Sequence, residues 1–164
     1  MNIKWKDNNT GGIRKIDYFP QSYIIDLASN KQELEDLVIA ENISQNTKFW
    51  GVRQDIPSIL KSSDVIVMSS HFEGLSLSNI EGMSVGKPFI ASDVDGLHEI
   101  TEGAGLLFKH GDYVQLANLI LELTNDKELY NKTAEKCLQR ARQYDISKMV
   151  DGYLSVYQNL LKLK

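Results

Sequence analysis

Short apolar runs alternate along most of the chain with segments in which apolar residues recur at helical spacing. Runs of the first kind are typical of buried strands and span residues 22–28, 47–51, 64–70, 88–92 and 105–108. Segments of the second kind predict helices over residues 30–43, 55–63, 77–86, 112–126, 127–144 and 146–164, and residues 96–103 predict a turn or short helix. This alternation indicates an α/β fold with a doubly wound parallel sheet and helices on both faces.

The first 21 residues fit this alternation least well. IKWK and KIDYF have the composition of short strands, and the intervening NNTGG predicts a hairpin. We therefore divide the chain into an N-terminal segment, residues 1–21, and a Rossmann-like domain with C-terminal helices, residues 22–164. The total length of 164 residues suits one domain with a sizeable core.

Composition narrows the class of protein. Apolar residues make up 42% of the chain and charged residues 24%, which are ordinary values for a globular protein. The net charge of −4 gives no reason to expect nucleic acid as a partner. No apolar run approaches the roughly 20 residues of a membrane span. Cys137 is the single cysteine, so a reducing, cytoplasmic setting is favoured, and we expect it to be an unreactive thiol.

The segment SSHFEGLSLSNIEGMSVGKPFIASD, residues 69–93, places two glutamates between two buried strands. Glu73 falls in the loop after a strand, at the edge where ligands of open α/β sheets bind. Glu81 falls one turn into the next helix. Backbone N–H groups at the start of that helix can bind a phosphate without a basic side chain. This order of groups matches the sugar, diphosphate and ribose of a sugar nucleotide.

The same segment resembles the signature of glycosyltransferase family 4, the group 1 transferases with the GT-B fold. That signature has two glutamates separated by seven residues, the second within E-A-M-A-x-G-x-P-V-I-A-S. The matching positions here are Glu73, Glu81, Met83, Gly86, Pro88, Ile90, Ala91 and Ser92. FWG resembles the family's F-L-G, and GAGLLFKHGD resembles G-x-G-x-L-V-x-P-G-D. The similarity covers residues 22–160 and implies the C-terminal, donor-binding half of a GT-B enzyme.

The resemblance also implies roles for individual residues. It places Glu73 beside the donor sugar as the catalytic residue, and Glu81 on the ribose hydroxyls. The diphosphate would lie on the backbone N–H groups between them, contributed by Gly74, Leu75, Ser76, Leu77 and Ser78. Gly51, His71 and Glu99 are further candidates for the site. No metal is expected, and we interpret Asp93 and Asp95 as part of a turn.

Simpler interpretations exist for several of these residues. Glu81 could be the partner of Ser78 in a capping box, because Ser78 stands three residues before it. Glu73 and His71 could be ordinary solvated loop residues, and Glu99 could cap a helix. Ser76 replaces a glycine that is common in the family. Gly82 replaces an alanine, which should cost the helix about 1 kcal/mol.

We therefore expect a donor-binding domain of a retaining, metal-independent transferase that moves sugar from a nucleoside diphosphate sugar to a glycan or lipid-linked acceptor. The alternatives are a non-catalytic nucleotide-sugar-binding module, a partner subunit of a split transferase and, less favoured, a sugar-nucleotide epimerase. The resemblance implies that this chain lacks the acceptor-binding N-terminal GT-B half as its partner in catalysis, so we expect no transfer from this chain alone. The full enzyme would be cytoplasmic, with peripheral association at the inner membrane face. Part of the last helix should remain exposed, since it carries apolar residues for that other half.

Overall fold

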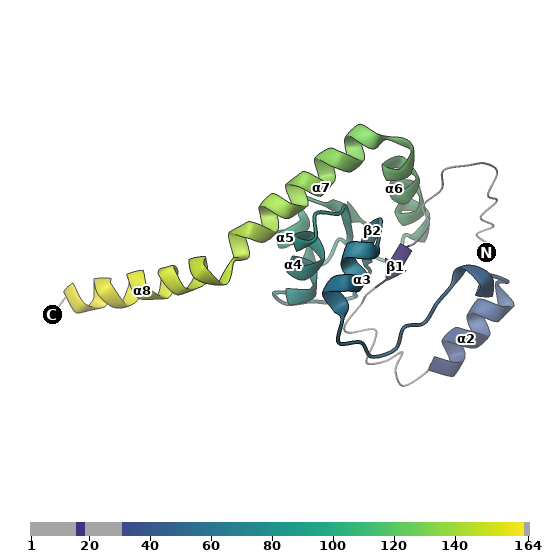
Figure 1. Ribbon diagram of the computed structural model, residues 1–164, viewed down its shortest axis with the longest axis horizontal. Helices are drawn as coiled ribbons and strands as arrows, with labels where there is room; N and C mark the ends of the chain where they lie inside the picture. Colours follow the sequence, from purple (N-terminus) through teal and green to yellow (C-terminus); the bar gives the residue numbers. More distant parts are fainter. Residues whose placement is uncertain (1–15, 19–30, 163–164) are drawn as a thin grey trace.

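The computed structural model describes residues 16–18 and 31–162. Within these residues, the chain forms a parallel sheet of four strands in the order β1-β2-β3-β4 (Figure 1). The strands are β1 (Ile16–Tyr18), β2 (Val65–Met68), β3 (Phe89–Ser92) and β4 (Leu106–Phe108). This arrangement is the predicted Rossmann-like α/β architecture, since helices connect successive parallel strands.

Seven α-helices and two short 3-10 helices are described. The α-helices are α2 (Lys31–Ala40), α3 (Ile56–Ser62), α4 (Leu77–Ser84), α5 (Leu97–Thr101), α6 (Tyr113–Asn125), α7 (Lys127–Ala141) and α8 (Ile146–Lys162). The 3-10 helices are η1 (Ser44–Asn46) and η2 (Arg142–Tyr144). Each lies within or close to a segment whose periodicity predicted a helix.

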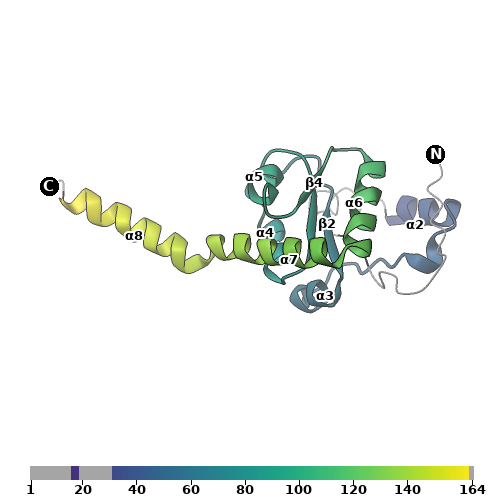
Figure 2. The same ribbon diagram turned by 90° about the horizontal axis from the view of Figure 1, so that it is seen from above.

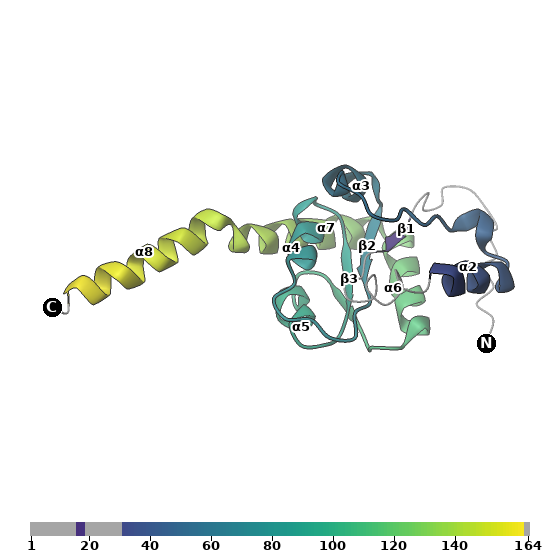
Figure 3. The same cartoon turned by 90° about the horizontal axis from the view of Figure 1, so that it is seen from below.

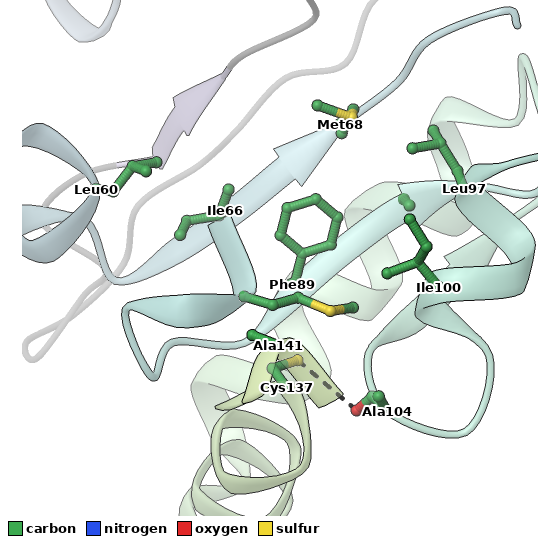
Figure 4. Close-up of a cluster of buried hydrophobic side chains, with 11 residues drawn as sticks. Leu60, Ile66, Met68, Phe89, Leu97, Ile100, Ala104, Cys137 and Ala141 are labelled. Atoms are coloured by element: carbon green, nitrogen blue, oxygen red, sulfur yellow. Dashed lines mark hydrogen bonds between the residues drawn. The ribbon is translucent and has the colours of Figure 1, made fainter. Parts of the chain in front are cut away.

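Helices cover both faces of the sheet, as predicted (Figure 2). On one face, Ile66, Met68, Phe89 and Ala91 pack against α3, α4, α5 and the second half of α7, and Figure 4 shows this cluster. On the other face, side chains of β2, β3 and β4 pack against α6 and the start of α7. The alternation of side chains along β2 and β3 therefore supplies two cores, one on each face of the sheet, as expected for a buried parallel sheet.

Gly82 lies where α4 approaches the sheet. An alanine Cβ at this position would come within 2.5 Å of the Phe89 ring and 3.3 Å of Ile66. The predicted cost of this glycine to the helix is therefore offset, because only a residue without a side chain allows α4 to lie against Phe89. The family pattern has alanine and valine at the positions of Gly82 and Phe89, so this chain departs from it at both contacting residues.

One prediction about the first third of the chain needs correction, and another is confirmed only in part. Residues 47–51 do not form a strand: Gly51 has a φ of 61°, and the Trp50 ring lies 3.9 Å from Lys48 Nζ and 5.2 Å from the Arg53 guanidinium. KIDYF does contain a strand, β1, and it pairs in parallel with β2; the other residues of the predicted hairpin lie outside the described part of the chain, so the hairpin remains a prediction. IKWK and the strand predicted over residues 22–28 lie outside the described residues, so both remain predictions.

The last helix, α8, projects from the body of the domain (Figures 1 and 2). None of its 17 residues is buried. Its apolar side chains are 45% to 73% exposed; they are Ile146, Met149, Val150, Tyr153, Leu154, Val156, Tyr157, Leu160 and Leu161. The expected exposure of this stripe is confirmed, and it extends over the whole helix. No described helix has the length and apolar character needed to cross a membrane.

Candidate active site

Three loops meet at the carboxyl edge of the sheet; of the strands that lead to them, Figure 3 labels β2 and β3, and Figure 2 labels β4. They are the β2–α4 loop (residues 69–76), the β3–α5 loop (residues 93–96) and the β4–α6 loop (residues 109–112). In open α/β sheets this edge is where ligands bind. The β2–α4 loop contains Glu73 and contacts each of the other two loops.

Glu73 is held by a short relay of serines. Ser92, at the end of β3, donates its hydroxyl to the carbonyl oxygen of Ser70 at 2.6 Å. The Ser70 hydroxyl in turn donates to Oε1 of Glu73 at 2.8 Å. Ser70 and Ser92 are buried and Glu73 is half-buried. Glu73 is therefore positioned by the sheet through two hydrogen bonds, which argues against a freely solvated loop carboxylate.

The helix that follows this loop is capped by Ser76 and not by Ser78. The Ser76 hydroxyl accepts a hydrogen bond from the backbone N–H of Asn79 at 3.4 Å, so Ser76 is the N-cap of α4. The predicted capping by Ser78 is wrong, because Ser78 already lies in the first turn. In the described part of the chain, the N–H groups of Leu77 and Ser78 have no hydrogen-bond partner. These groups can donate hydrogen bonds to an anion at the positive end of the helix dipole.

Glu81 lies on α4 with its side chain exposed to solvent. The residue three positions after the N-cap Ser76 is Asn79, so Glu81 is too far along the helix to complete a capping box. This geometry removes the simpler interpretation of Glu81. Glu73 and Glu81 thus lie on either side of the α4 N-terminus, one before it and one after it in the chain. Leu75 and Leu77, between them, are exposed.

Gly96 braces the loop from the side of β3. Its φ is 79°, and a Cβ at this position would meet the carbonyl oxygens of Gly74 and Glu73 at 2.1 and 2.4 Å. Any other residue would push the β2–α4 loop away from its observed position.

The third loop contacts the β2–α4 loop through His110, whose ring centroid is 4.3 Å from that of His71 at an interplanar angle of 55°. Both histidines are exposed.

The remaining candidates lie at the periphery of this edge or away from it. Gly51 is exposed in the segment before α3, and no described contact joins it to the loop. Glu99 is exposed on α5. Asp93 lies in a turn, as predicted, and its Oδ1 is 2.6 Å from Nδ1 of His98, which also approaches Glu102 at 3.2 Å. The hydrogen bond that His98 donates to Asp93 raises the pKa of His98 above its usual value.

Arg140 of α7 stabilises the far end of α5. Its guanidinium donates to the carbonyl oxygens of Glu99 (3.1 Å), Ile100 (3.0 Å) and Glu102 (2.9 Å). These are terminal helix carbonyls that otherwise have no intrahelical partner. The contact ties α7 to the helix that follows the β3–α5 loop.

Among the described residues, no group of three or more histidines, cysteines, aspartates or glutamates could hold a metal ion. A hollow of about 580 Å³ opens between α6 and the start of α7, lined by Asn118, Leu121, Glu122, Asn125, Asp126 and Leu129. Because α6 runs away from the carboxyl edge of the sheet, this hollow is remote from Glu73. The candidate site is therefore the carboxyl edge of the sheet, where the three loops bring Glu73 and the α4 N-terminus together.

Sequence reasoning missed several residues of this site. The roles of Ser70 and Ser92 could have been suspected from their positions at the ends of two adjacent parallel strands. Gly96 carried the ordinary signal of a turn glycine, but its contact with the backbone of Glu73 depends on the fold. His110 gave no local signal, since its contact with His71 joins residues in two loops.

The parallel α/β sheet and the strand-loop-helix arrangement at its carboxyl edge define a Rossmann-like α/β domain. A family model described as "Glycosyl transferases group 1" matches residues 21–144. The chain therefore belongs to the group 1 glycosyltransferase family, as its resemblance implied.

Curated relatives of the chain include two bacterial enzymes. The UDP-Gal:alpha-D-GlcNAc-diphosphoundecaprenol alpha-1,3-galactosyltransferase of Escherichia coli is 32% identical over 123 residues, which is 73% of this chain and 32% of the relative. The N,N'-diacetylbacillosaminyl-diphospho-undecaprenol alpha-1,3-N-acetylgalactosaminyltransferase of Campylobacter jejuni is 32% identical over 116 residues, 70% of this chain and 31% of the relative. The chain thus spans about a third of the length of these relatives.

Solved structures agree on the fold. HepE of Anabaena in complex with UDP-glucose superposes with a TM-score of 0.72 at 25% identity, covering 78% of this chain and 36% of HepE. The C-terminal domain of the group 1 glycosyltransferase LpcC from Francisella tularensis superposes with a TM-score of 0.61 at 25% identity. The superposition covers 72% of this chain and 63% of the LpcC chain.

Proposed function

We propose that this chain is the donor-binding part of a retaining glycosyltransferase. Its substrate would be a nucleoside diphosphate sugar, and the sugar would pass to a glycan or lipid-linked acceptor held by an acceptor-binding half. The observation that carries this proposal is the pair Glu73 and Glu81 on either side of the α4 N-terminus. One carboxylate is fixed by Ser70, and the other has no capping role.

The comparisons support the donor and the position of the chain within a larger enzyme. LpcC's matching segment is described as a C-terminal domain, and HepE was solved with UDP-glucose. The name of the Escherichia coli relative gives a UDP-sugar as donor and a diphosphoundecaprenol-linked sugar as acceptor. The same classes of donor and acceptor are reasonable for this chain, and the lipid-linked acceptor would bring the enzyme to a membrane surface.

In this proposal, each part of the site has a separate task. The N–H groups of Leu77 and Ser78, together with those of the preceding loop, would donate hydrogen bonds to the oxygens of the diphosphate. They are fixed dipoles, so they would stabilise the charge that develops on the leaving diphosphate without reorganising. Glu81 would accept hydrogen bonds from the ribose hydroxyls. Glu73 has one oxygen bonded to Ser70, which leaves the other for a hydroxyl of the donor sugar.

No metal is part of this proposal, because backbone N–H groups and the helix dipole take the place of a cation beside the diphosphate. Retention of configuration is likewise proposed from the family resemblance. The acceptor's base would lie outside the site described here.

Calorimetry with UDP, GDP, ADP and their glucose conjugates tests the proposal. We expect one diphosphate series to bind, and to bind equally well before and after treatment with EDTA. Loss of binding on chelation, restored by Mg²⁺ or Mn²⁺, would contradict the placement of the diphosphate on the helix. Absence of binding across the whole series would contradict the donor-binding role itself.

A further inference from the structure

Two histidines from different loops touch at the carboxyl edge of the sheet. His71 follows β2 and lies two residues before Glu73, whereas His110 follows β4. Their ring centroids are 4.3 Å apart, and both side chains are exposed on the edge that the proposed donor would occupy. Because β3 lies between β2 and β4, the two loops reach each other over the end of β3.

The fold of the β4–α6 loop does not depend on the imidazole of His110. The turn is closed by the hydrogen bond from the Asp112 N–H to the Lys109 carbonyl at 2.8 Å, and Gly111 supplies the positive φ of 80°. No hydrogen bond of the described residues uses the backbone N–H of His110. The similar family segment G-x-G-x-L-V-x-P-G-D has proline at this position, which is consistent with a turn that needs no N–H there.

Positive groups are scarce at this edge. In the three loops, residues 69–76, 93–96 and 109–112, the basic side chains are His71, Lys109 and His110. The acidic side chains are Glu73, Asp93, Asp95 and Asp112. Three of these acids are already engaged, since Glu73 accepts from the Ser70 hydroxyl, Asp93 contacts His98 and Asp112 accepts from the Gln115 N–H at 2.8 Å. A diphosphate bound here would find the two imidazoles and Lys109 as its side-chain partners at this edge.

We propose that His71 and His110 together contact the second phosphate of the donor, the phosphate that carries the sugar. This inference rests on the proposed function and adds side-chain contacts to the backbone groups of α4. Each imidazole can donate one N–H to a phosphate oxygen. The contact between the rings would fix both donors in place before the ligand arrives, which reduces the entropy lost on binding.

The test compares the tightest of UDP, GDP and ADP with its monophosphate, measured by calorimetry on His71→Asn and His110→Pro. The proline variant keeps the turn and removes the ring, so loss of folding is not its expected effect. Each change should weaken the diphosphate about tenfold, as for one hydrogen bond to a charged group, and leave the monophosphate within about twofold. His98→Gln is the matched control, because His98 is engaged by Asp93, and it should bind both nucleotides like the wild type.

The outcomes separate this inference from the proposed function. If the wild type binds the diphosphate and both histidine variants bind it equally well, the histidine contact is wrong and the donor site stands. An equal loss of diphosphate and monophosphate would also overturn it, because that result places the effect away from the second phosphate. If the wild type binds none of these nucleotides, the proposed function fails and the inference fails with it.

Discussion

Replacing Gly82 by alanine should destabilise the protein, although alanine is the better helix former. The new Cβ would lie 2.5 and 2.9 Å from two carbons of the Phe89 ring. Carbon atoms in good contact are about 3.5–4.0 Å apart, so the overlap is roughly 1 Å. Phe89 is fully buried, so its ring has no solvent into which it can move. Overpacking of this kind costs about 1–3 kcal/mol, whereas helix propensity returns about 1 kcal/mol.

A double-mutant cycle with Phe89→Val isolates this contact. Phe89→Val alone should lower the free energy of unfolding by about 2–4 kcal/mol, because it leaves a cavity in the core. In that background, however, Gly82→Ala has room for its methyl group and should raise stability by about 1 kcal/mol. The two changes should therefore be coupled by about 1–3 kcal/mol, which lies within the range expected for residues in direct contact.

Urea unfolding followed by circular dichroism measures all four proteins, with the slope m checked for constancy. Gly152→Ala in α8 is the matched control, since nothing lies within 4 Å of a Cβ there and only propensity acts. If Gly82→Ala stabilised the wild type by the same amount as the Phe89→Val background, the close approach of α4 to Phe89 would be refuted.

Three other predictions concern the framework around the site. Arg140→Lys should lower the free energy of unfolding by about 2 kcal/mol, because one ammonium group cannot donate to all three carbonyls that the guanidinium binds. Arg142→Ala is the control: Arg142 is exposed, so this change should alter the free energy of unfolding little in the same urea assay. The pKa of His98 is raised in the folded state, so its interaction with Asp93 stabilises the fold fully below the unfolded pKa of about 6.5. This stabilisation is lost as the pH rises through the folded pKa. NMR titration of His98 should give a midpoint above about 6.5, and Asp93→Asn should lower that midpoint. Burial raises the pKa of Cys137 to about 11, so a thiol reagent at pH 8 should label it only after unfolding, and rapid labelling of the native protein would contradict its place in the core (Figure 4).

Elements with a strong local signal could be predicted from the sequence. The apolar runs that became β2 and β3, and the periodicity of α6 and α7, needed no tertiary information, because a fully apolar run between turn signals has few other uses. Residues 47–51 show the limit of that signal. Their composition suits a strand, but a strand exists only where a neighbouring strand supplies hydrogen bonds, and no local pattern reveals that neighbour.

The site was predictable in its residues and less so in its details. Glu73 and Glu81 were found from spacing and resemblance, but either Ser76 or Ser78 could have started the helix, and the choice depends on backbone angles. Helix propensity alone predicts that Gly82 destabilises α4. Its benefit appears only when Phe89, seven residues further along, packs against it. The relay from Ser92 to Ser70 likewise depends on which strands are neighbours.

The central claim is that a sugar nucleotide binds between Glu73 and Glu81, and the affinity of Glu81→Ala for the tightest nucleoside diphosphate tests it most directly. Loss of two hydrogen bonds to a carboxylate should cost about 2–4 kcal/mol, or about 30-fold or more in the dissociation constant. The melting temperature should stay close to that of the wild type, because Glu81 is exposed and caps nothing. Glu122→Ala, an exposed glutamate on α6, should bind like the wild type. An unchanged dissociation constant for Glu81→Ala would contradict the account.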